Sequence, residues 1–571
     1  MSTAFNKLPI FIYFLFPVAC GQVLEPGSEA HIRQVISAVD YHRIVVANSH
    51  PEDWLTSGRN YSEDRYSELD QITKSNINEL GLAWSINLGV YGGLKSTPIV
   101  SDGIMFMSGP WSKVYAIDVR KGEIVWIYDP EVPREYGIKV CCDVVNRGVS
   151  MYKGMIYVGT LDGRLVAIEA ATGKLVWETL TVDQNKPYNI TGGTRVFDGK
   201  VLIGNSGGDY EVRGYVTAYD AISGEQIWRF YTVPGNPAHG FESEAMEEAA
   251  STWSGEWWTM GGGGAVLDAI VYDPELKLVY IGTGNGSTWN GDVRSPGEGD
   301  KLYLSSIVAL HLESGEMEWY YQQIPGETFD FTATQPIILA DLEIEAKPRK
   351  VLMQAPKNGF FYVLDRTNGE LISAEPYVHV NWASHIDLDS GRPVEHKYAP
   401  YTDCAHQIAP TANEGHNWLP MSYNRVTGLV YLPVRESFER VASLKICLFN
   451  DYGKLLAWDP IEQKEVWSVR QVSNWNGGVL STRDLVFQGD AKGIFKAFDA
   501  GSGKKLWSYD LGTGIMAAPN TFMVDGVQYV SIAVGWGGAE GLLDQAMTEN
   551  INPGTVYTFA LGKMEAPPVF K

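Results

Sequence analysis

A short motif that recurs along the chain constrains the fold more than any other feature of the sequence. Each copy begins with a stretch of alternating apolar and polar residues, typical of a strand, that ends in Ala-x-Asp or Ala-x-Glu. A turn that usually contains glycine follows, and then a second strand in which tryptophan is the last residue of the motif. Glycine adopts the positive φ that a tight hairpin needs, and a large indole ring can pack between neighbouring sheets. In five copies the acid precedes the tryptophan by eight residues: Asp118 and Trp126, Glu169 and Trp177, Asp220 and Trp228, Asp459 and Trp467, Asp499 and Trp507.

The spacing of the copies predicts the architecture. Trp126, Trp177 and Trp228 are each 51 residues apart, and a unit of about 40–50 residues holds four strands, the size of one propeller blade. Seven copies are clear, and an eighth blade can join the stretch around Trp84 to the strand 555–560, which would remove the free sheet edges. We therefore predict an all-β, eight-bladed β-propeller with tryptophan-docking repeats.

The two ends of the chain fall outside this repeat. An apolar run at 9–19 follows Lys7 and is too short to cross a bilayer, which is typical of an export signal. We predict a signal peptide over 1–20, a propeller over 35–563 and a C-terminal tail over 564–571. Cys20 faintly resembles a lipoprotein acceptor, but simple cleavage and a periplasmic location are the main expectation. The mature chain then holds four cysteines, which permits two disulfides: Cys141, Cys142, Cys404 and Cys447.

Charge and motif content exclude several functions. With 45 Lys and Arg against 68 Asp and Glu, the net charge of −23 argues against a nucleic-acid partner. The sequence holds no His-Glu-x-x-His zinc site and no phosphate loop. The stretch 204–208 fits Gly-x-Ser-x-Gly, but the strand pattern that follows it lacks the helix of a hydrolase nucleophile elbow. Without a Cys-x-x-Cys-His motif, no attached c-type haem domain is expected.

The adjacent pair Cys141 and Cys142 is the most unusual local feature. Adjacent cysteines can close only an eight-membered ring with a distorted peptide, so two separate partners or two free thiols are equally open from the dipeptide alone. Arg147 lies a few residues beyond the pair. Because loops converge at a propeller axis, such residues between repeats are candidates for a binding site.

The stretch 141–148, Cys-Cys-Asp-Val-Val-Asn-Arg-Gly, resembles the pyrroloquinoline-quinone (PQQ) dependent alcohol dehydrogenases, the quinoprotein methanol and ethanol dehydrogenase family. The resemblance extends over nearly the whole mature chain, and the family fold is an eight-bladed propeller. Further matching stretches, in order, are 53–59, 97–100, 213–220, 282–286, 329–335, 355–362, 415–418 and 535–538.

The resemblance implies a role for each matching position. A disulfide between Cys141 and Cys142 would roof the planar quinone, Lys357 would face its ortho-quinone oxygens, and Asp330 would be the catalytic base. Asp209, Asn285 and Asp330 would bind Ca²⁺, which prefers oxygen ligands. The remaining positions implied to line PQQ are Arg147, Thr191, Ser206, Gly207, Gly208, Asn417, Trp475 and Trp536.

Several positions depart from the family pattern. Leu267 stands where a tryptophan forms the floor under PQQ, Ala265 replaces a threonine, and Phe329 replaces a tryptophan. Asp209 replaces a glutamate ligand and is one methylene shorter, while Lys95 replaces a glutamate and could pair with a PQQ carboxylate. Members that use lanthanides carry an additional Asp two residues beyond the base. Here that residue is Thr332, so the sequence predicts Ca²⁺ as the metal.

Two classes of function follow. The first is an exported dehydrogenase that oxidises a small alcohol with PQQ and Ca²⁺ and passes electrons to a separate cytochrome c, as a possible homodimer. The second is a non-catalytic or degenerate propeller that acts as a binding or assembly scaffold. A scaffold need not keep Asp330 and Asn285, so their presence favours the enzyme.

Overall fold

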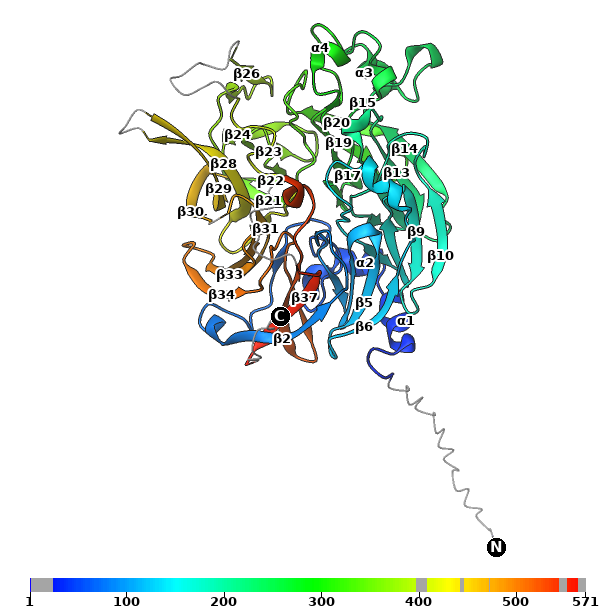
Figure 1. Ribbon diagram of the computed structural model, residues 1–571, viewed down its shortest axis with the longest axis vertical. Helices are drawn as coiled ribbons and strands as arrows, with labels where there is room; N and C mark the ends of the chain where they lie inside the picture. The colour runs from blue at the N-terminus through cyan, green and yellow to red at the C-terminus, as the bar shows by residue number, and fades with distance from the viewer. Residues whose placement is uncertain (2–23, 397–407, 442–445, 472, 544–551, 563–571) are drawn as a thin grey trace.

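The computed structural model describes residues 1, 24–396, 408–441, 446–471, 473–543 and 552–562, with side chains left out at 438–451. Its strands form eight four-stranded antiparallel blades that follow one another around a ring in chain order (Figure 1). The predicted all-β, eight-bladed propeller is therefore confirmed. The predicted signal peptide and tail lie almost entirely outside the described residues, as does Cys404, and the domain boundaries stay predictions.

The first four blades come from residues 99–322. Their strands are β3 (Ile99–Ser101), β4 (Ile104–Ser108), β5 (Val114–Asp118) and β6 (Glu123–Tyr128); β7 (Ser150–Tyr152), β8 (Met155–Gly159), β9 (Arg164–Glu169) and β10 (Leu175–Leu180); β11 (Arg195–Phe197), β12 (Lys200–Gly204), β13 (Tyr215–Asp220) and β14 (Gln226–Tyr231); and β16 (Ile270–Asp273), β17 (Leu278–Gly282), β19 (Ser306–His311) and β20 (Met317–Gln322).

Three further blades continue the ring. Their strands are β21 (Ile337–Ile344), β22 (Lys347–Gln354), β23 (Phe360–Asp365) and β24 (Leu371–Pro376); β27 (Ser422–Asn424), β28 (Leu429–Val441), β29 (Ile446–Asp459) and β30 (Lys464–Arg470); and β31 (Asn476–Thr482), β32 (Leu485–Asp490), β33 (Ile494–Asp499) and β34 (Lys505–Asp510). A short strand, β1 (Tyr66–Ser67), pairs in parallel with β31.

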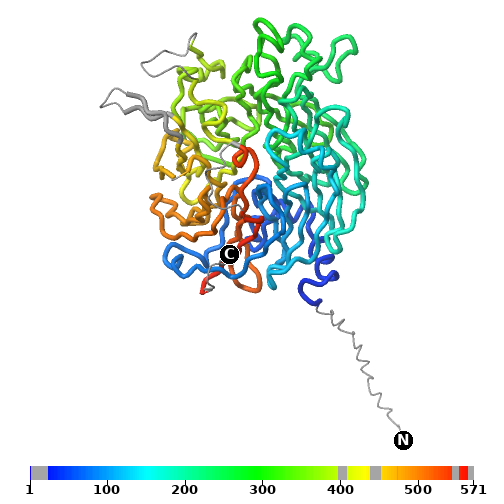
Figure 2. The backbone as a smooth tube through the Cα atoms, viewed as in Figure 1, coloured from blue at the N-terminus to red at the C-terminus, as the bar shows by residue number. Residues whose placement is uncertain are grey.

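The eighth blade joins the two ends of the chain, as the sequence predicts. It holds β35 (Asn520–Val524), β36 (Val527–Val534), β37 (Thr555–Leu561) and, as its outer strand, β2 (Leu80–Asn87). Trp84 on β2 lies opposite Thr558 on β37. Figure 2 shows the blue N-terminal and red C-terminal segments side by side at this closure. The closure ties the ring together without leaving either terminal strand unpaired.

The repeated tryptophans join each blade to the next. The indole N–H of Trp228 donates to the backbone oxygen of Leu312 in the following blade at 2.8 Å, and the Trp507 indole donates to Leu80 at the closure at 3.1 Å. Six of the rings also lie against the turn glycine of the next hairpin, as Trp228 does against Gly315; the others are Trp84, Trp126, Trp177, Trp319 and Trp467. A side chain on that glycine would overlap the ring, so the motif needs glycine and tryptophan together.

The remaining elements are short and lie between the blades. The long interval between Trp228 and Trp319 holds an excursion with α3 (Glu244–Ala250), η6 (Pro237–His239), η7 (Trp257–Met260), β15 (Gly262–Gly263), β18 (Gly286–Ser287) and α4 (Gly291–Arg294). Elsewhere lie α1 (Glu29–Ser37), α2 (Tyr41–Val45), η1 (Ala47–Ser49), η2 (Ile77–Glu79), η3 (Pro110–Ser112), η4 (Arg134–Lys139), η5 (Gly208–Tyr210), β25 (Ala383–Ile386), β26 (Pro393–Glu395) and α5 (Ala539–Leu543). Within the described ranges, no helix has the length and apolar character needed to span a membrane.

The docking contact makes a testable prediction about Gly315. Its φ is +73°, and an added Cβ would come within 2.5 Å of the Trp228 ring. Gly428 also has a φ of +73° but has nothing within 4 Å of such a Cβ. Alanine at either site costs about 1–2 kcal/mol of backbone strain, and Gly315→Ala should cost a further ~1–3 kcal/mol through overpacking. Thermal unfolding should therefore show a clearly larger loss for Gly315→Ala than for Gly428→Ala; equal losses would contradict the docking role.

Candidate active site

Loops from the same end of the blades enclose a cavity of about 540 Å³. The lining residues come from loops far apart in the sequence, including the β6–β7 loop, η5, the β20–β21 loop and α5. Figure 1 shows α5 near the middle of the ring. The sequence-predicted residues that line the cavity are Cys141, Cys142, Arg147, Asp209, Asn285, Asp330, Lys357, Asn417 and Trp475.

Cys141 and Cys142 form a disulfide with each other and lie on the cavity wall. Of the alternatives that the dipeptide leaves open, the structure therefore has the vicinal disulfide. The next residue, Asp143, accepts a hydrogen bond from the backbone N–H of Gly538 at 3.0 Å. This bond ties the cysteine loop to the segment that leads into α5, so two walls of the cavity are joined.

Arg147 forms the cationic side of the cavity. Its Nη1 donates to the hydroxyl of Thr191 at 2.8 Å, and that hydroxyl lies 2.9 Å from the hydroxyl of Ser206. The Nε of Arg147 has no hydrogen-bond partner among the described residues. Burial lowers the pKa of Arg147, opposed by Asp268 and Glu540. A buried guanidinium with a spare donor is suited to an anionic ligand.

Asp209, Asn285, Asp330 and Lys357 gather at another part of the cavity. The Asn285 amide donates to the Asp209 carboxylate at 3.1 Å, and Lys357 Nζ lies 3.3 Å from Asp330 Oδ2. Burial raises the pKa of the Asp330 carboxyl; Lys357 lowers it and Asp209 raises it further. A cation placed beside two neighbouring carboxylates offsets the repulsion between their charges. The pairing thus suits both metal binding and proton transfer.

The other predicted residues lie behind the cavity wall. Thr191 and Ser206 support Arg147 as described, and an added Cβ on Gly208 would come within 3.1 Å of Ala265. Gly207 has a φ of +91° at the start of η5, which carries Asp209 into the cavity. Trp536 packs in a buried cluster with Trp475. These five positions (Thr191, Ser206, Gly207, Gly208 and Trp536) do not line the cavity, and whether they bind a ligand stays a prediction.

Lys95 has a different partner from the one that its sequence position suggested. Its Nζ lies 2.6 Å from the Glu540 carboxylate, and both side chains are 1% exposed. The indole N–H of Trp418 donates to the other Glu540 oxygen at 3.2 Å. Two cations contact the Trp418 ring: Lys95 Nζ and Arg147 Cζ each lie 5.0 Å from its centroid. The charge of Lys95 is therefore balanced within the chain, without a ligand carboxylate.

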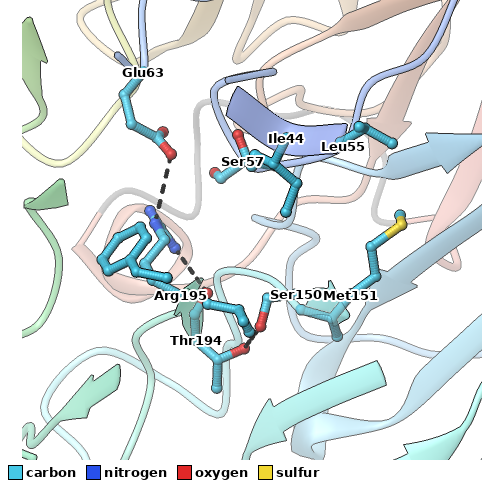
Figure 3. Close-up of a pocket in the computed structure, with 12 residues that line it drawn as sticks. Ile44, Leu55, Ser57, Glu63, Ser150, Met151, Thr194 and Arg195 are labelled. Atoms are coloured by element: carbon cyan, nitrogen blue, oxygen red, sulfur yellow. Dashed lines mark hydrogen bonds and ion pairs between the residues drawn. The ribbon is translucent and has the colours of Figure 1, made fainter. Parts of the chain in front are cut away.

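A buried ion-pair chain leads away from the cavity. Asp268 lines the cavity and accepts from Arg195 Nη2 at 2.9 Å, and Arg195 Nε lies 3.6 Å from Glu63. Figure 3 shows Glu63 and Arg195 facing one another beside a second, very small cavity. Burial raises the pKa of Glu63 to about 7, although Arg195 lowers it. This chain fixes Asp268, and thereby the neighbouring Leu267, in the cavity wall.

The sequence analysis missed several residues that line the cavity or support it. Asp268 follows Leu267 directly, and Trp418 follows Asn417, so proximity to predicted positions was a usable signal. Glu327 lies three residues before Asp330 and so offered the same signal, whereas the partner of Glu540, Lys95, lies 445 residues away. Trp289 also lines the cavity, is 52% exposed, and donates to Asp209 at 3.0 Å.

Comparison with known proteins decides the family. The sequence profile of the PQQ-dependent family described as "Glucose/ethanol/alcohol dehydrogenase, beta-propeller domain" matches residues 54–378 and 445–530. The chain belongs to this family. The resemblance found in the sequence and the prediction of a PQQ-dependent alcohol dehydrogenase are thereby confirmed.

Individual relatives are similar over most of the chain. A quinohemoprotein alcohol dehydrogenase from Comamonas testosteroni is 50% identical over 95% of this chain and 81% of the relative. Its crystal structure aligns with a TM-score of 0.89 at 48% identity, over 95% of this chain and 85% of that one. A 1-butanol dehydrogenase (cytochrome c) from Thauera butanivorans is 46% identical over 91% of this chain and 79% of the relative. The structure of a europium-containing methanol dehydrogenase aligns with a TM-score of 0.82 at 32% identity, over 91% of this chain and 100% of that one.

The Lys95–Glu540 pair makes a prediction about stability. Glu540→Gln keeps an acceptor for Trp418 but leaves the Lys95 charge buried without a counter-charge, which should cost about 3–5 kcal/mol. In the double variant Lys95→Met/Glu540→Gln the charge is gone as well, so most of that stability should return. Thermal unfolding of the ligand-free protein measures both. A double variant no more stable than the single one would contradict the ion pair as the source of the loss.

Proposed function

We propose that this dehydrogenase is exported and oxidises alcohols to aldehydes or ketones with PQQ and Ca²⁺, delivering electrons to a separate cytochrome c. One observation supports the proposal most strongly: a single cavity is lined by the Arg147 guanidinium, whose Nε has no partner among the described residues, and by the vicinal disulfide. The carboxylates of Asp209 and Asp330 line the same cavity. These groups suit an anionic planar cofactor, a divalent cation and a proton acceptor within one site.

The cavity residues fit PQQ, which carries three carboxylates on a planar ring system. The Nε of Arg147 and the indole N–H of Trp475 are buried donors without partners among the described residues. Arg147 can therefore receive a carboxylate without giving up its bond to Thr191. Leu267 lines the cavity where the family pattern has tryptophan, and it still offers an apolar surface to a flat ring. Losing an aromatic face costs about 0.5–1.5 kcal/mol, which weakens binding rather than abolishing it.

The same cavity fits a calcium ion. Asp209 and Asp330 supply two carboxylates, and Asn285 would supply its carbonyl oxygen once its amide turns away from the bond with Asp209. No group of three or more His, Cys, Asp or Glu side chains suited to a metal is found in the part of the chain that the structure describes. Calcium takes six to eight oxygen ligands. A cofactor that brings oxygen atoms of its own therefore suits this incomplete set.

The residues around Asp330 account for the proton chemistry. When bound, PQQ would accept the carbinol hydrogen as a hydride, with both electrons of the C–H bond, and Ca²⁺ would polarise the quinone. Asp330 takes the hydroxyl proton, for which its raised proton affinity suits it. Lys357, 3.3 Å from Asp330, orients that carboxylate and places positive charge beside the site. Leu267 and Trp289 line the wall with apolar surface for the carbon chain of the substrate.

The name of the Thauera relative, a 1-butanol dehydrogenase (cytochrome c), supports a cytochrome c as the electron acceptor. The apolar run at 9–19 supports export to the periplasm. No observation favours the alternative of a non-catalytic scaffold, because the cavity keeps its base, its carboxylate pair and its arginine.

The assignment of Asp330 predicts the behaviour of Asp330→Asn. An amide cannot accept the hydroxyl proton, so kcat should fall by at least ~10². The variant should still fold, because Asp330 bonds within the cavity and not within a blade. Dye reduction by the PQQ- and calcium-loaded protein measures the rate, with bound PQQ per chain as the control for loading. A fully loaded variant with near-normal turnover would remove Asp330 from the mechanism.

The ligand set predicts calcium in preference to a trivalent ion. Asp209 and Asp330 carry two negative charges, which balance a divalent ion, and the residue two positions beyond Asp330 is the neutral Thr332. An uncompensated third charge in a partly buried site is costly. Ca²⁺ should therefore support dye reduction better than La³⁺, and Thr332→Asp should shift that preference toward La³⁺. Higher activity of the unaltered protein with La³⁺ would show that residue 332 does not determine the choice of metal.

A further inference from the structure

Glu327 is a fully buried acid that the proposed mechanism does not use. It lies in the loop between β20 and β21, three residues before Asp330, and its exposed fraction is 0%. Burial of a carboxylate is unfavourable unless hydrogen bonds satisfy its oxygens. The partners of Glu327 therefore show what the structure gains from placing it there.

Both oxygens of Glu327 accept hydrogen bonds from backbone N–H groups. Oε1 accepts from Phe329 at 2.7 Å and from Phe331 at 3.1 Å, the two residues that flank Asp330. Oε2 accepts from Gly286 at 3.1 Å, the residue after Asn285. One side chain thus binds the loop of the proposed base and the loop of a proposed metal ligand, which are 45 residues apart in the sequence.

The backbone at Asp330 needs such support. Its φ is +60°, in the left-handed region that residues other than glycine adopt at a cost. Bonds to the N–H groups on both sides of Asp330 hold this conformation and with it the direction of the carboxyl group. The bond to Gly286 then sets the separation between the Asp330 and Asn285 loops.

Arg294 completes the arrangement from behind. Its guanidinium is fully buried and donates to the backbone oxygens of Glu327, Thr288 and Trp289. It lies so close to Gly286 that an added Cβ there would meet its Cζ. The positive charge of Arg294 also offsets the negative charge of Glu327. The backbone hydrogen bonds and the charge of Arg294 oppose the cost of burying this carboxylate, although burial still raises its pKa.

We infer that Glu327 is a positioning residue that holds Asp330 and Asn285 at the separation needed for one shared divalent cation. This inference rests on the proposed calcium-dependent function. Glu327 itself lines no part of the cavity and contacts neither substrate nor cofactor, so it acts through the two loops. Partners that orient metal ligands in this way are typically worth 10–100-fold in metal affinity.

Two substitutions at Glu327 and one control test the inference. Glu327→Gln offers one acceptor oxygen where Glu offers two, so its NH₂ group faces a backbone N–H on one of the two loops. Glu327→Asp keeps the charge and can still bond locally, but it is too short to reach Gly286. The control is Asp273→Asn. Asp273 is also buried, accepts from the backbone N–H groups of Glu275 and Leu276, and lies at the end of β16 away from the Asn285 loop.

The measurement is the Ca²⁺ dissociation constant of the PQQ-loaded protein, followed by the change in PQQ absorbance, together with kcat and KM for the alcohol at saturating Ca²⁺. Both Glu327 variants should bind Ca²⁺ about 10–100-fold more weakly, with a lower kcat and little change in KM. Asp273→Asn should lower the thermal unfolding midpoint while leaving Ca²⁺ affinity unchanged. If Glu327→Gln fails to fold, Glu327→Asp alone decides.

Unchanged Ca²⁺ affinity in a folded Glu327 variant would overturn the inference and leave the proposed function intact. An equal loss of affinity in Asp273→Asn would also overturn it, because the effect would then be one of general stability. If the unaltered protein binds PQQ but shows no response to Ca²⁺, the proposed metal site fails, and the inference fails with it.

Discussion

The contact between a tryptophan of one blade and the turn glycine of the next is the interaction on which the rest of the structure depends. Five indole N–H groups, those of Trp126, Trp177, Trp228, Trp467 and Trp507, donate to a backbone oxygen in the neighbouring blade, and these bonds fix the blades to one another. The bond from Trp507 to Leu80 joins the seventh blade to the eighth at the closure. Because the ring is closed, loops separated by hundreds of residues are brought to one end of a common axis. The cavity exists because of this convergence.

Within the cavity the charges are divided by position. Arg147 keeps a donor without a partner among the described residues on one side, while Asp209 and Asp330 lie with Asn285 and Lys357 at another part of the cavity. Lys95 is already paired with Glu540, so its charge needs no further anion. We propose that a planar polyanion and a divalent cation meet these two needs together within one site.

The sequence predicts the propeller and much of the cavity because both leave local signals. The motif from acid to tryptophan repeats with fixed spacing, and the cavity residues lie within short stretches typical of the family, such as the one that holds Cys141 and Arg147. The partners of Lys95 and Glu327 are different. Glu540 is 445 residues from Lys95, and Gly286 is 41 residues from Glu327, so nothing in the neighbouring sequence indicates either contact. Such pairs depend on how the loops of different blades meet, which only the folded ring determines.

If this cavity oxidises alcohols with bound PQQ, each PQQ should take up the two electrons of one alcohol oxidation. A single-turnover experiment without any electron acceptor measures this. The protein is loaded with PQQ and Ca²⁺, freed of excess cofactor, and mixed with a primary alcohol in the absence of oxygen and dye. The account predicts one equivalent of aldehyde per bound PQQ, formed together with the absorbance change of cofactor reduction. Tightly bound PQQ that yields neither aldehyde nor reduced cofactor would contradict it.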